Sequence, residues 1–224
     1  MMSFRCLTTS FLLPLAFVPG LVVGQLAAPP AAPKPDVRYV FYLHGAGVEQ
    51  NPTKAKEDWR GIVRSLGGKG FVVITEQRGL NTNVRDYAKK VSDQAKDLMA
   101  KGVPPENITI MGYSKGGLIA LSAAAWTQEP RINYVILAGC GTDKRPEIHQ
   151  AQAAAAPRYK GRMLSIFDAA DPEFGSCQPL FDAAGADVRG SERRIETGLG
   201  HQAFSMASAL WFDPTVEFIG GGAK

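Results

Sequence analysis

Ser114 stands in the stretch GYSKG (residues 112–116), with a glycine two positions before it and another two positions after it. When a sharp turn holds such a serine exposed, its hydroxyl can attack a carbonyl carbon as a nucleophile. The apolar stretch ITIMGY precedes the serine directly and the helical pattern KGGLIAL follows it, which leaves no spare residue for a flexible loop. This arrangement predicts a strand–serine–helix turn, with Gly112 and Gly116 required where strand and helix approach closely.

Six short segments rich in β-branched and aromatic residues are predicted to be the strands that position this serine. Several of them are apolar almost throughout, which is typical of a parallel sheet covered on both faces. The six segments are residues 37–43, 71–75, 107–113, 133–139, 162–167 and 193–197.

Longer segments between the strands carry the periodicity of helices. In residues 83–102, apolar side chains recur along one stripe and Gly102 ends the pattern. Alternating strands and helices require right-handed crossovers, so we expect a doubly wound α/β fold with a mostly parallel sheet of about six strands. The predicted helices span residues 51–66, 83–102, 115–128, 201–212 and 214–219.

Ligands of such sheets bind at the carboxyl ends of the strands. The residues of greatest chemical interest follow the predicted strands, so we expect all of them at one edge of the sheet. They lie at positions 44–47, 76–79, 114, 140, 168–171 and 198–201.

On the stretch GYSKG, the chain from about residue 37 to its C-terminus resembles the α/β-hydrolase family, whose nucleophile elbow has the pattern G-x-S-x-G. The stretches GFVVITEQR, ILAGCG, GSC and TGLGHQAF resemble a branch of small bacterial hydrolases within it. The resemblance implies an α/β-hydrolase fold with Ser114 as nucleophile, followed along the chain by an acid and then a histidine. It implies no metal and no organic cofactor.

The histidine that the resemblance requires is assigned to His201, one of three in the chain. His149 lies in a polar helical stretch away from the expected site. His44 ends the first strand in YLHGAG, which looks like the family's oxyanion loop, where a histidine supports the loop. His201 follows the last predicted strand, and imidazole suits a general base near neutral pH. The alternative for His201 is a cap of the last helix.

Two carboxylates, Asp168 and Asp171, are candidates for the acid that orients this histidine. Such an acid accepts the second ring N–H, which fixes the tautomer and stabilises the imidazolium. In the family, the acid stands a few residues past its strand, so the resemblance favours Asp171. Asp168 would then shape the turn through bonds from its side chain to the backbone.

An oxyanion hole requires two N–H groups directed at the tetrahedral oxygen. By resemblance, one belongs to Lys115, directly after the nucleophile, and the other to Ala46 in the HGAG loop, with Gly47 as the alternative. The positive end of the helix that follows Ser114 would add to this stabilisation. Glu76 or Arg78 could reach the same edge, although a structural ion pair is the simpler role for them.

These residues predict a serine hydrolase that cleaves ester-type acyl bonds of a small molecule through an acyl-enzyme. Only residues 141–161 separate Cys140 from the next predicted strand, so we expect a small or open lid. Thioesters or amides would be cleaved by the same groups, and an acyltransferase would replace water by another acceptor. The remaining alternative is a non-catalytic binding protein that retains the fold, which would have no use for all three side chains.

The first residues predict a secretory signal peptide, residues 1–24. A short basic start precedes the apolar run Phe11–Val23, which is too short to cross a bilayer core of roughly 30 Å and contains prolines. Val22 and Gly24 occupy the small-residue positions before the cleavage site. We therefore expect a periplasmic or secreted protein without stable membrane insertion after cleavage. The alternatives are an uncleaved anchor and a buried strand.

Residues 25–36 are rich in alanine and proline, a composition typical of an extended linker, so the folded domain is expected to comprise residues 37–224. Its two cysteines, Cys140 and Cys177, form an even pair, which predicts a disulfide in an exported protein. Closure of that loop would stabilise the fold by at most about 3.8 kcal/mol. The alternative is two buried free thiols.

The composition excludes several classes of function. The 224 residues include 45% hydrophobic and 21% charged side chains, as expected for one soluble globular domain. The net charge of +4 comes from scattered lysines and arginines, so we predict no nucleic-acid partner. Because the histidines lie far apart and the cysteine spacing does not fit a zinc site, we expect no metal.

Overall fold

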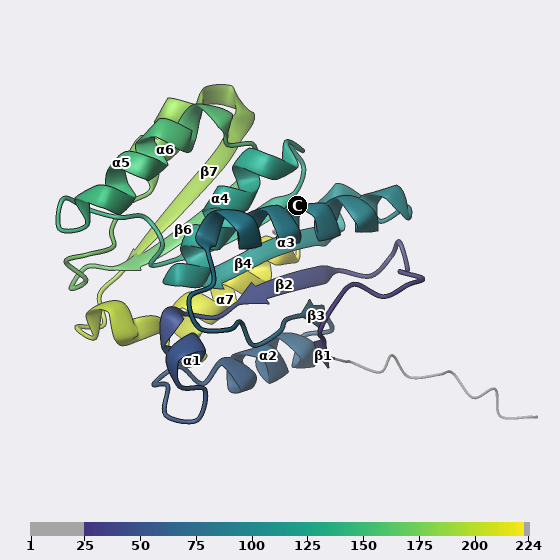
Figure 1. Cartoon of the computed structure of the whole chain (residues 1–224), viewed down its shortest axis with the longest axis horizontal. Coiled ribbons are helices and arrows are strands. Elements are labelled where there is room, and N and C mark those ends of the chain that lie inside the picture. Colours follow the sequence, from purple (N-terminus) through teal and green to yellow (C-terminus); the bar gives the residue numbers. More distant parts are fainter. Residues whose placement is uncertain (1–24, 222–224) are drawn as a thin grey trace, which may run out of the picture.

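Seven segments of the chain form a single sheet in the computed structural model, which describes residues 25–221 (Figure 1). The strand order is β1-β3-β2-β4-β5-β6-β7, and each pair of neighbouring strands is parallel. The predicted doubly wound sheet is therefore confirmed, with seven strands in place of about six. The strands are β1 (Gln25–Leu26), β2 (Tyr39–Leu43), β3 (Val72–Ile74), β4 (Ile108–Tyr113), β5 (Asn133–Leu137), β6 (Gly161–Asp168) and β7 (Val188–Ile195).

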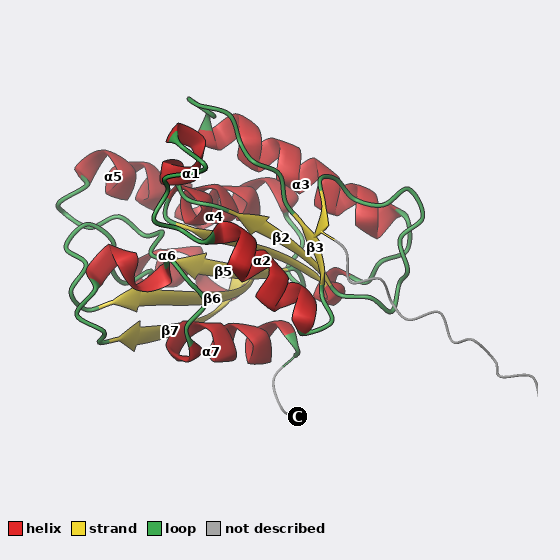
Figure 2. Cartoon of the chain, turned by 90° about the horizontal axis from the view of Figure 1, so that it is seen from below, coloured by secondary structure: helices red, strands yellow, loops and turns green. Residues whose placement is uncertain are grey.

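Helices cover both faces of this sheet (Figure 2). Helices α3, α4, α5 and α6 lie over one face, whereas α2 and α7 lie over the other. Each face has its own hydrophobic core. The helices are α1 (Ala46–Gln50), α2 (Trp59–Gly68), α3 (Val84–Ala100), α4 (Lys115–Thr127), α5 (Pro146–Ala155), α6 (Gln178–Ala184) and α7 (Ala209–Ile219).

The central strands are buried on both sides because successive side chains of a strand point to opposite faces. In β2, Tyr39, Phe41 and Leu43 pack in the core beneath α3 and α4. Val40 and Tyr42 of the same strand pack in the core beneath α2 and α7. This two-sided burial explains why the strand is apolar throughout.

Residues 25–36 differ from the linker that their composition predicts, because Gln25 and Leu26 form the edge strand β1. The backbone N–H of Thr75 donates to the carbonyl of Leu26 at 2.8 Å. An edge strand presents free backbone groups that pair with an extended segment whatever its side chains, so composition gives no sign of this pairing. The predicted signal peptide lies outside the described residues. Among the residues that the structure describes, no helix is long and apolar enough to cross a membrane.

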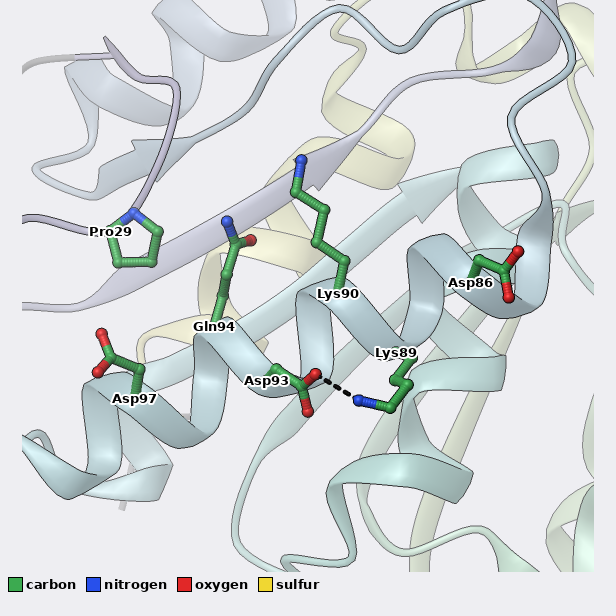
Figure 3. A pocket seen from close by; sticks show the side chains of 7 residues that line it. All are labelled: Pro29, Asp86, Lys89, Lys90, Asp93, Gln94 and Asp97. Carbon is green, nitrogen blue, oxygen red and sulfur yellow. Dashed lines mark hydrogen bonds and ion pairs between the residues drawn. The ribbon is translucent and has the colours of Figure 1, made fainter.

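The chain beyond β1 runs close to the exposed face of α3 (Figure 3). Pro29 lies opposite Gln94 and Asp97 of this helix, and a shallow hollow of about 560 Å³ separates them. An ion pair between Lys89 and Asp93, 2.7 Å long, borders the hollow. Its lining consists of Pro29 and residues of α3 and includes none of the residues expected at the site, so the hollow is distinct from that site.

Between β2 and β3, a helix over residues 51–66 is predicted, but residues 51–58 form turns and α2 begins only at Trp59, while the short helix α1 precedes the predicted range. The side chain of Asn51 accepts backbone N–H groups of the turn that follows α1. Asp58 then caps the start of α2 by accepting the N–H of Gly61 at 2.9 Å. Polar caps at two positions thus interrupt a segment that reads as one periodic helix.

The C-terminal elements also differ from the prediction. β7 begins at Val188 rather than at residue 193, because it pairs with β6 along its whole length. A short 3₁₀ helix, Gly200–Phe204, follows and carries His201. Helix α7 continues through Pro214, where a break between two helices is predicted. Burial of Trp211 and Phe212 in the core holds this helix in place despite the proline.

The predicted disulfide between Cys140 and Cys177 is present. Cys140 lies just after β5 and Cys177 precedes α6, with their Cα atoms 5.4 Å apart and both side chains buried. A β-bridge between Gly141 and Phe174 lies beside it. The disulfide therefore fastens the loop after β6 to the loop after β5, at the carboxyl edge of the sheet.

Candidate active site

Ser114 forms the sharp turn between β4 and α4, with no residue between it and either element. Its backbone angles, φ 56° and ψ −121°, lie in a region that non-glycine residues rarely occupy. The backbone N–H of Ser114 donates to the carbonyl of Leu137 at 2.9 Å, which holds the turn in this strained form. The hydroxyl of Ser114 therefore lies at the carboxyl edge of the sheet, as the sequence predicts.

The two glycines of the turn stand where strand and helix come closest. A Cβ atom on Gly112 would lie 2.1 Å from the carbonyl oxygen of Gly116. A Cβ atom on Gly116 would lie 1.8 Å from the carbonyl oxygen of Leu43 in β2. Neither distance is compatible with a side chain, so both positions require glycine for close approach.

His201 lies between the serine and a carboxylate. Its Nε2 atom is 2.8 Å from the hydroxyl oxygen of Ser114, and its Nδ1 atom is 2.7 Å from Oδ2 of Asp171. The three side chains come from three different loops and lie 30 and 87 positions apart along the chain. A neutral imidazole with its proton on Nδ1 would donate to Asp171 and accept from the serine hydroxyl.

Two aromatic side chains contact the ring of His201. The rings of Tyr113 and Phe174 have centroids 5.1 Å and 4.9 Å from the imidazole centroid. The hydroxyl of Tyr113 also donates to the backbone carbonyl of His201 at 2.9 Å. These contacts limit the movement of the imidazole, which a proton transfer between fixed partners requires.

Asp168 and Asp171 have different hydrogen-bond partners. Both oxygens of Asp168 accept hydrogen bonds from other residues. Oδ1 accepts the N–H of Ala170 in its own loop at 2.8 Å, and Oδ2 accepts the N–H and the hydroxyl of Thr197 in the loop after β7. Burial alone would raise the pKa of Asp168, but these hydrogen bonds outweigh burial and lower it. Asp171 alone of the two contacts His201.

The two residues proposed to donate their N–H groups to the oxyanion are each the first residue of a helix. Ala46 is the first residue of α1 and Lys115 is the first residue of α4, so their N–H groups have no acceptor within their own helices. The preceding residues, Gly45 and Ser114, place no side-chain cap on these helix starts in the described residues. Among the described residues, neither N–H group donates to a backbone carbonyl outside its helix. Their role as oxyanion donors stays a prediction.

His44 is buried behind the oxyanion loop and does not contact Ser114. Its Nε2 atom accepts the backbone N–H of Arg78 at 2.9 Å. Burial and the nearby Arg78 guanidinium lower the pKa of His44 to about 4. His44 is thus neutral at physiological pH, and its Nδ1 atom lies 2.9 Å from the carbonyl oxygen of Gly45. The supporting role that the sequence resemblance implies for it stays a prediction. His149 contacts the carbonyl of Gly141 from α5.

An ion-pair cluster connects α1 to α4. Arg78 donates from Nε to Oε1 of Glu49 at 2.7 Å, and Lys115 donates from Nζ to Oε2 of Glu49 at 2.5 Å. Arg78 and Glu49 are almost completely buried. Arg78 thus has the structural ion pair that the sequence favours for it, and Glu76 forms its ion pair with Lys90 instead.

Glu57 is a buried carboxylate that the sequence analysis misses. Its Oε2 accepts the backbone N–H of Gly45 at 2.7 Å and its Oε1 accepts the hydroxyl of Tyr42 at 2.8 Å. Burial raises the pKa of Glu57 to about 7, although both hydrogen bonds favour the ionised form. A single acidic residue in a charged loop carries no pattern, so neither Glu57 nor Glu49 stands out in the sequence.

In the described part of the chain, no group of three or more histidine, cysteine, aspartate or glutamate side chains could hold a metal ion. Ser114, His201 and Asp171 form a hydrogen-bonded chain from hydroxyl to imidazole to carboxylate. Such a chain can raise the nucleophilicity of the hydroxyl because the imidazole accepts its proton.

No family model and no curated protein sequence matches the chain. Many solved structures resemble it, and for several of them the match covers most of the known protein's chain. SOBER1 of Arabidopsis thaliana is 16% identical, with 82% of this chain and 98% of that chain covered and a TM-score of 0.51. Carboxylesterase CesB of Bacillus subtilis is 13% identical over 88% of this chain and 87% of that chain, with a TM-score of 0.56.

Esterase PE8 is 17% identical, with 89% of this chain and all of that chain covered and a TM-score of 0.53. At these identities the likeness concerns the fold. The chain has the α/β-hydrolase fold that the sequence resemblance implies.

Proposed function

We propose that this protein is a serine hydrolase that cleaves ester-type acyl bonds of small molecules. The observation that carries this proposal is the continuous contact from Ser114 through His201 to Asp171, at distances of 2.8 Å and 2.7 Å. Three polar side chains from distant loops meet at the carboxyl edge of the sheet, where α/β proteins bind their ligands. Several proteins of similar fold bear the name esterase or carboxylesterase, which supports this reaction class.

In the proposed reaction, the hydroxyl of Ser114 attacks the ester carbonyl while Nε2 of His201 accepts its proton. The carbonyl oxygen becomes an oxyanion, which the N–H groups of Ala46 and Lys115 stabilise. Asp171 stabilises the imidazolium that forms. The imidazolium then donates its proton to the leaving alcohol, and an acyl-enzyme remains on Ser114.

Hydrolysis of the acyl-enzyme uses the same groups in reverse roles. His201 removes a proton from water, the hydroxide attacks the acyl carbon, and a second oxyanion forms in the same place. Its collapse releases the carboxylic acid and returns the proton to Ser114. No step requires a cofactor. The insert between β5 and β6 consists of α5 and a short 3₁₀ helix, Ala156–Arg158, and this small size favours an open site for accessible acyl groups.

The proposal is tested by hydrolysis of p-nitrophenyl esters of increasing acyl length. We expect the purified protein to release p-nitrophenol, and Ser114→Ala to lower kcat by roughly 10⁴- to 10⁶-fold. Analysis of the acyl product separates hydrolysis from acyl transfer, because a transferase forms a new ester or amide when an acceptor is added. Turnover that is unchanged in Ser114→Ala contradicts the proposal.

We further propose that the protein is exported, with residues 1–24 removed. The disulfide between Cys140 and Cys177 supports this proposal, because disulfides persist in oxidising compartments. We expect the mature protein to begin at Gln25, and denatured samples to gain two thiols per chain on reduction. An intact leader on the exported protein, or equal thiol counts with and without reductant, contradicts it.

A further inference from the structure

Glu57 is buried at the site but takes no part in the proposed reaction. It lies in the loop before α2 and is 8% exposed. Burial of a carboxylate is unfavourable unless hydrogen bonds compensate for lost water. Gly45 and Tyr42 supply these bonds, at 2.7 Å and 2.8 Å. Because an apolar side chain at a buried position often stabilises a protein as well as a charged one does, the stability of the core does not by itself explain a glutamate here.

The bond to Gly45 acts on the oxyanion loop directly. Gly45 immediately precedes Ala46, whose N–H is one of the two proposed oxyanion donors. The fit around Gly45 is close, since a Cβ atom there would lie 2.9 Å from Oε2 of Glu57 and 3.4 Å from the ring of Tyr113. Glu57 therefore fixes the backbone one residue before the donor.

The same loop also contacts the segment that carries His201. The residue after Glu57, Asp58, donates its backbone N–H to the carbonyl of Ser205 at 2.7 Å. Ser205 in turn donates its N–H to the carbonyl of Gln202, next to His201, at 3.0 Å. Two adjacent residues thus hold the oxyanion loop and the histidine loop in a fixed relation.

We propose that Glu57 is a positioning residue of this active site. Its carboxylate holds the backbone at Gly45 so that the N–H of Ala46 points at the oxyanion beside Ser114, while Asp58 anchors the loop of His201. This inference rests on the proposed function of the site. Glu57 touches no reacting atom, and its effect on turnover passes through Ala46.

The expected size of the effect follows from what a donor contributes. Loss of one oxyanion donor lowers kcat by about 10²- to 10³-fold, and a displacement of about 1 Å at a reacting group lowers the rate by roughly 10²-fold. Without Glu57 the N–H of Ala46 remains but is less well directed. We therefore expect a 10- to 100-fold loss in kcat, with KM changed by less than about twofold because the ester ground state carries little charge.

The experiment compares Glu57→Leu, which removes both acceptor oxygens, with Glu57→Gln, which retains one oxygen for the N–H of Gly45. Turnover of the best p-nitrophenyl ester and inhibition by an alkyl boronic acid are measured. The boronic acid forms a tetrahedral adduct with a serine hydroxyl and presents an oxygen to the N–H donors. We expect Glu57→Leu to lose kcat and boronate affinity by similar factors, and Glu57→Gln to stay within about fivefold of wild type.

Tyr42→Phe is the matched control, because it removes the other hydrogen bond of the same carboxylate and leaves the bond to Gly45 intact. We expect its kcat to be near that of wild type. Wild-type kcat in Glu57→Leu overturns the inference, as does unchanged boronate affinity beside a lower kcat. An equal loss of kcat in Tyr42→Phe also overturns it.

If Glu57→Leu does not fold, Glu57→Asp replaces it, since the shorter side chain keeps the charge but cannot reach Gly45 from the same backbone position. A loss of at least about fivefold in kcat at unchanged KM then supports the inference, and wild-type kcat overturns it. These outcomes differ from a failure of the proposed function itself. In that case the wild-type protein would hydrolyse no ester and Ser114→Ala would change nothing.

Discussion

His201 is the residue on which the proposed chemistry depends most, because it must bind two partners in one orientation. Its ring nitrogens face Ser114 and Asp171, and the rings of Tyr113 and Phe174 both contact its imidazole. The hydrogen bond from Tyr113 to its backbone carbonyl fixes the segment as well. An imidazole held in this way needs little reorganisation before it accepts a proton.

Asp171 and Asp168 can be distinguished by one pair of variants. Asp171→Asn should lower kcat by roughly 10⁴-fold, because an amide cannot hold the imidazole in the correct tautomer or stabilise the imidazolium. Asp168→Asn should instead lower the melting temperature, because Asp168 accepts bonds from Ala170 and Thr197 that order the loop. Steady-state kinetics and thermal unfolding check the two effects. A larger loss of turnover in Asp168→Asn than in Asp171→Asn contradicts the assignment.

The raised pKa of Glu57 predicts a dependence of stability on pH. Because the pKa rises from 4.5 to about 7 on folding, the folded chain holds this proton more tightly than the unfolded chain. The protonated carboxyl group stabilises the folded chain fully below pH 4.5, and this stabilisation is lost as the pH rises from 4.5 through 7. The variant Glu57→Gln lacks the titratable carboxyl group and therefore serves as the reference.

We therefore expect the free energy of unfolding of wild type, relative to Glu57→Gln, to decline between about pH 4.5 and pH 7, by on the order of 3 kcal/mol, and to change little above that range. Urea unfolding at a series of pH values measures it. A difference that stays constant or grows with pH is the contrary result.

The junction of β4 and α4 depends on the absence of side chains at its glycines. Gly116→Ala should destabilise the fold by about 3 kcal/mol or more, because its Cβ atom would lie 1.8 Å from the carbonyl oxygen of Leu43. The matched control is Gly68→Ala near the end of α2, where a Cβ atom would meet nothing within 4 Å. Alanine there should be neutral or stabilise by up to about 1 kcal/mol. Equal stability of the two variants contradicts the account of this junction.

Helices α1 and α4 are joined through Glu49. Arg78→Met should lower the free energy of unfolding by about 3–5 kcal/mol, because it removes a partner of a buried carboxylate that bonds at 2.7 Å. Lys89→Met, which removes an exposed pair with Asp93, should change stability by less than about 0.5 kcal/mol. Chemical unfolding of both variants under the same conditions measures the difference. Similar small effects in both would show that the buried pair of Arg78 with Glu49 adds no more stability than an exposed pair.

Sequence patterns predicted those elements whose boundaries are set locally. The β4–Ser114–α4 turn follows from two adjacent periodicities and two glycines. The division between α1 and α2 depends instead on caps at Asn51 and Asp58 that a periodic pattern conceals. The pairing of β1 depends on a free sheet edge that residues 25–26 do not encode in their composition.

At the scale of the whole molecule, the parallel sheet brings the proposed site together. Every strand ends at the same edge, so residues 114, 171 and 201 meet although they are distant in the chain, and Ala46 follows β2 at the same edge. This convergence could be predicted because it follows from strand order and handedness. The roles of Glu49 and Glu57 could not, because they arise from side-chain packing between loops whose courses the sequence leaves open.

Labelling of the folded protein by a fluorophosphonate, followed by mass spectrometry of its peptides, tests most directly whether Ser114 is a nucleophile activated by His201. We expect one covalent adduct per chain, on the peptide that carries Ser114, because the imidazole of His201 accepts the hydroxyl proton. Ser114→Ala should take up no label, and His201→Ala should take it up far more slowly. Absence of an adduct on the folded wild-type chain, or an adduct that persists in Ser114→Ala, contradicts the account.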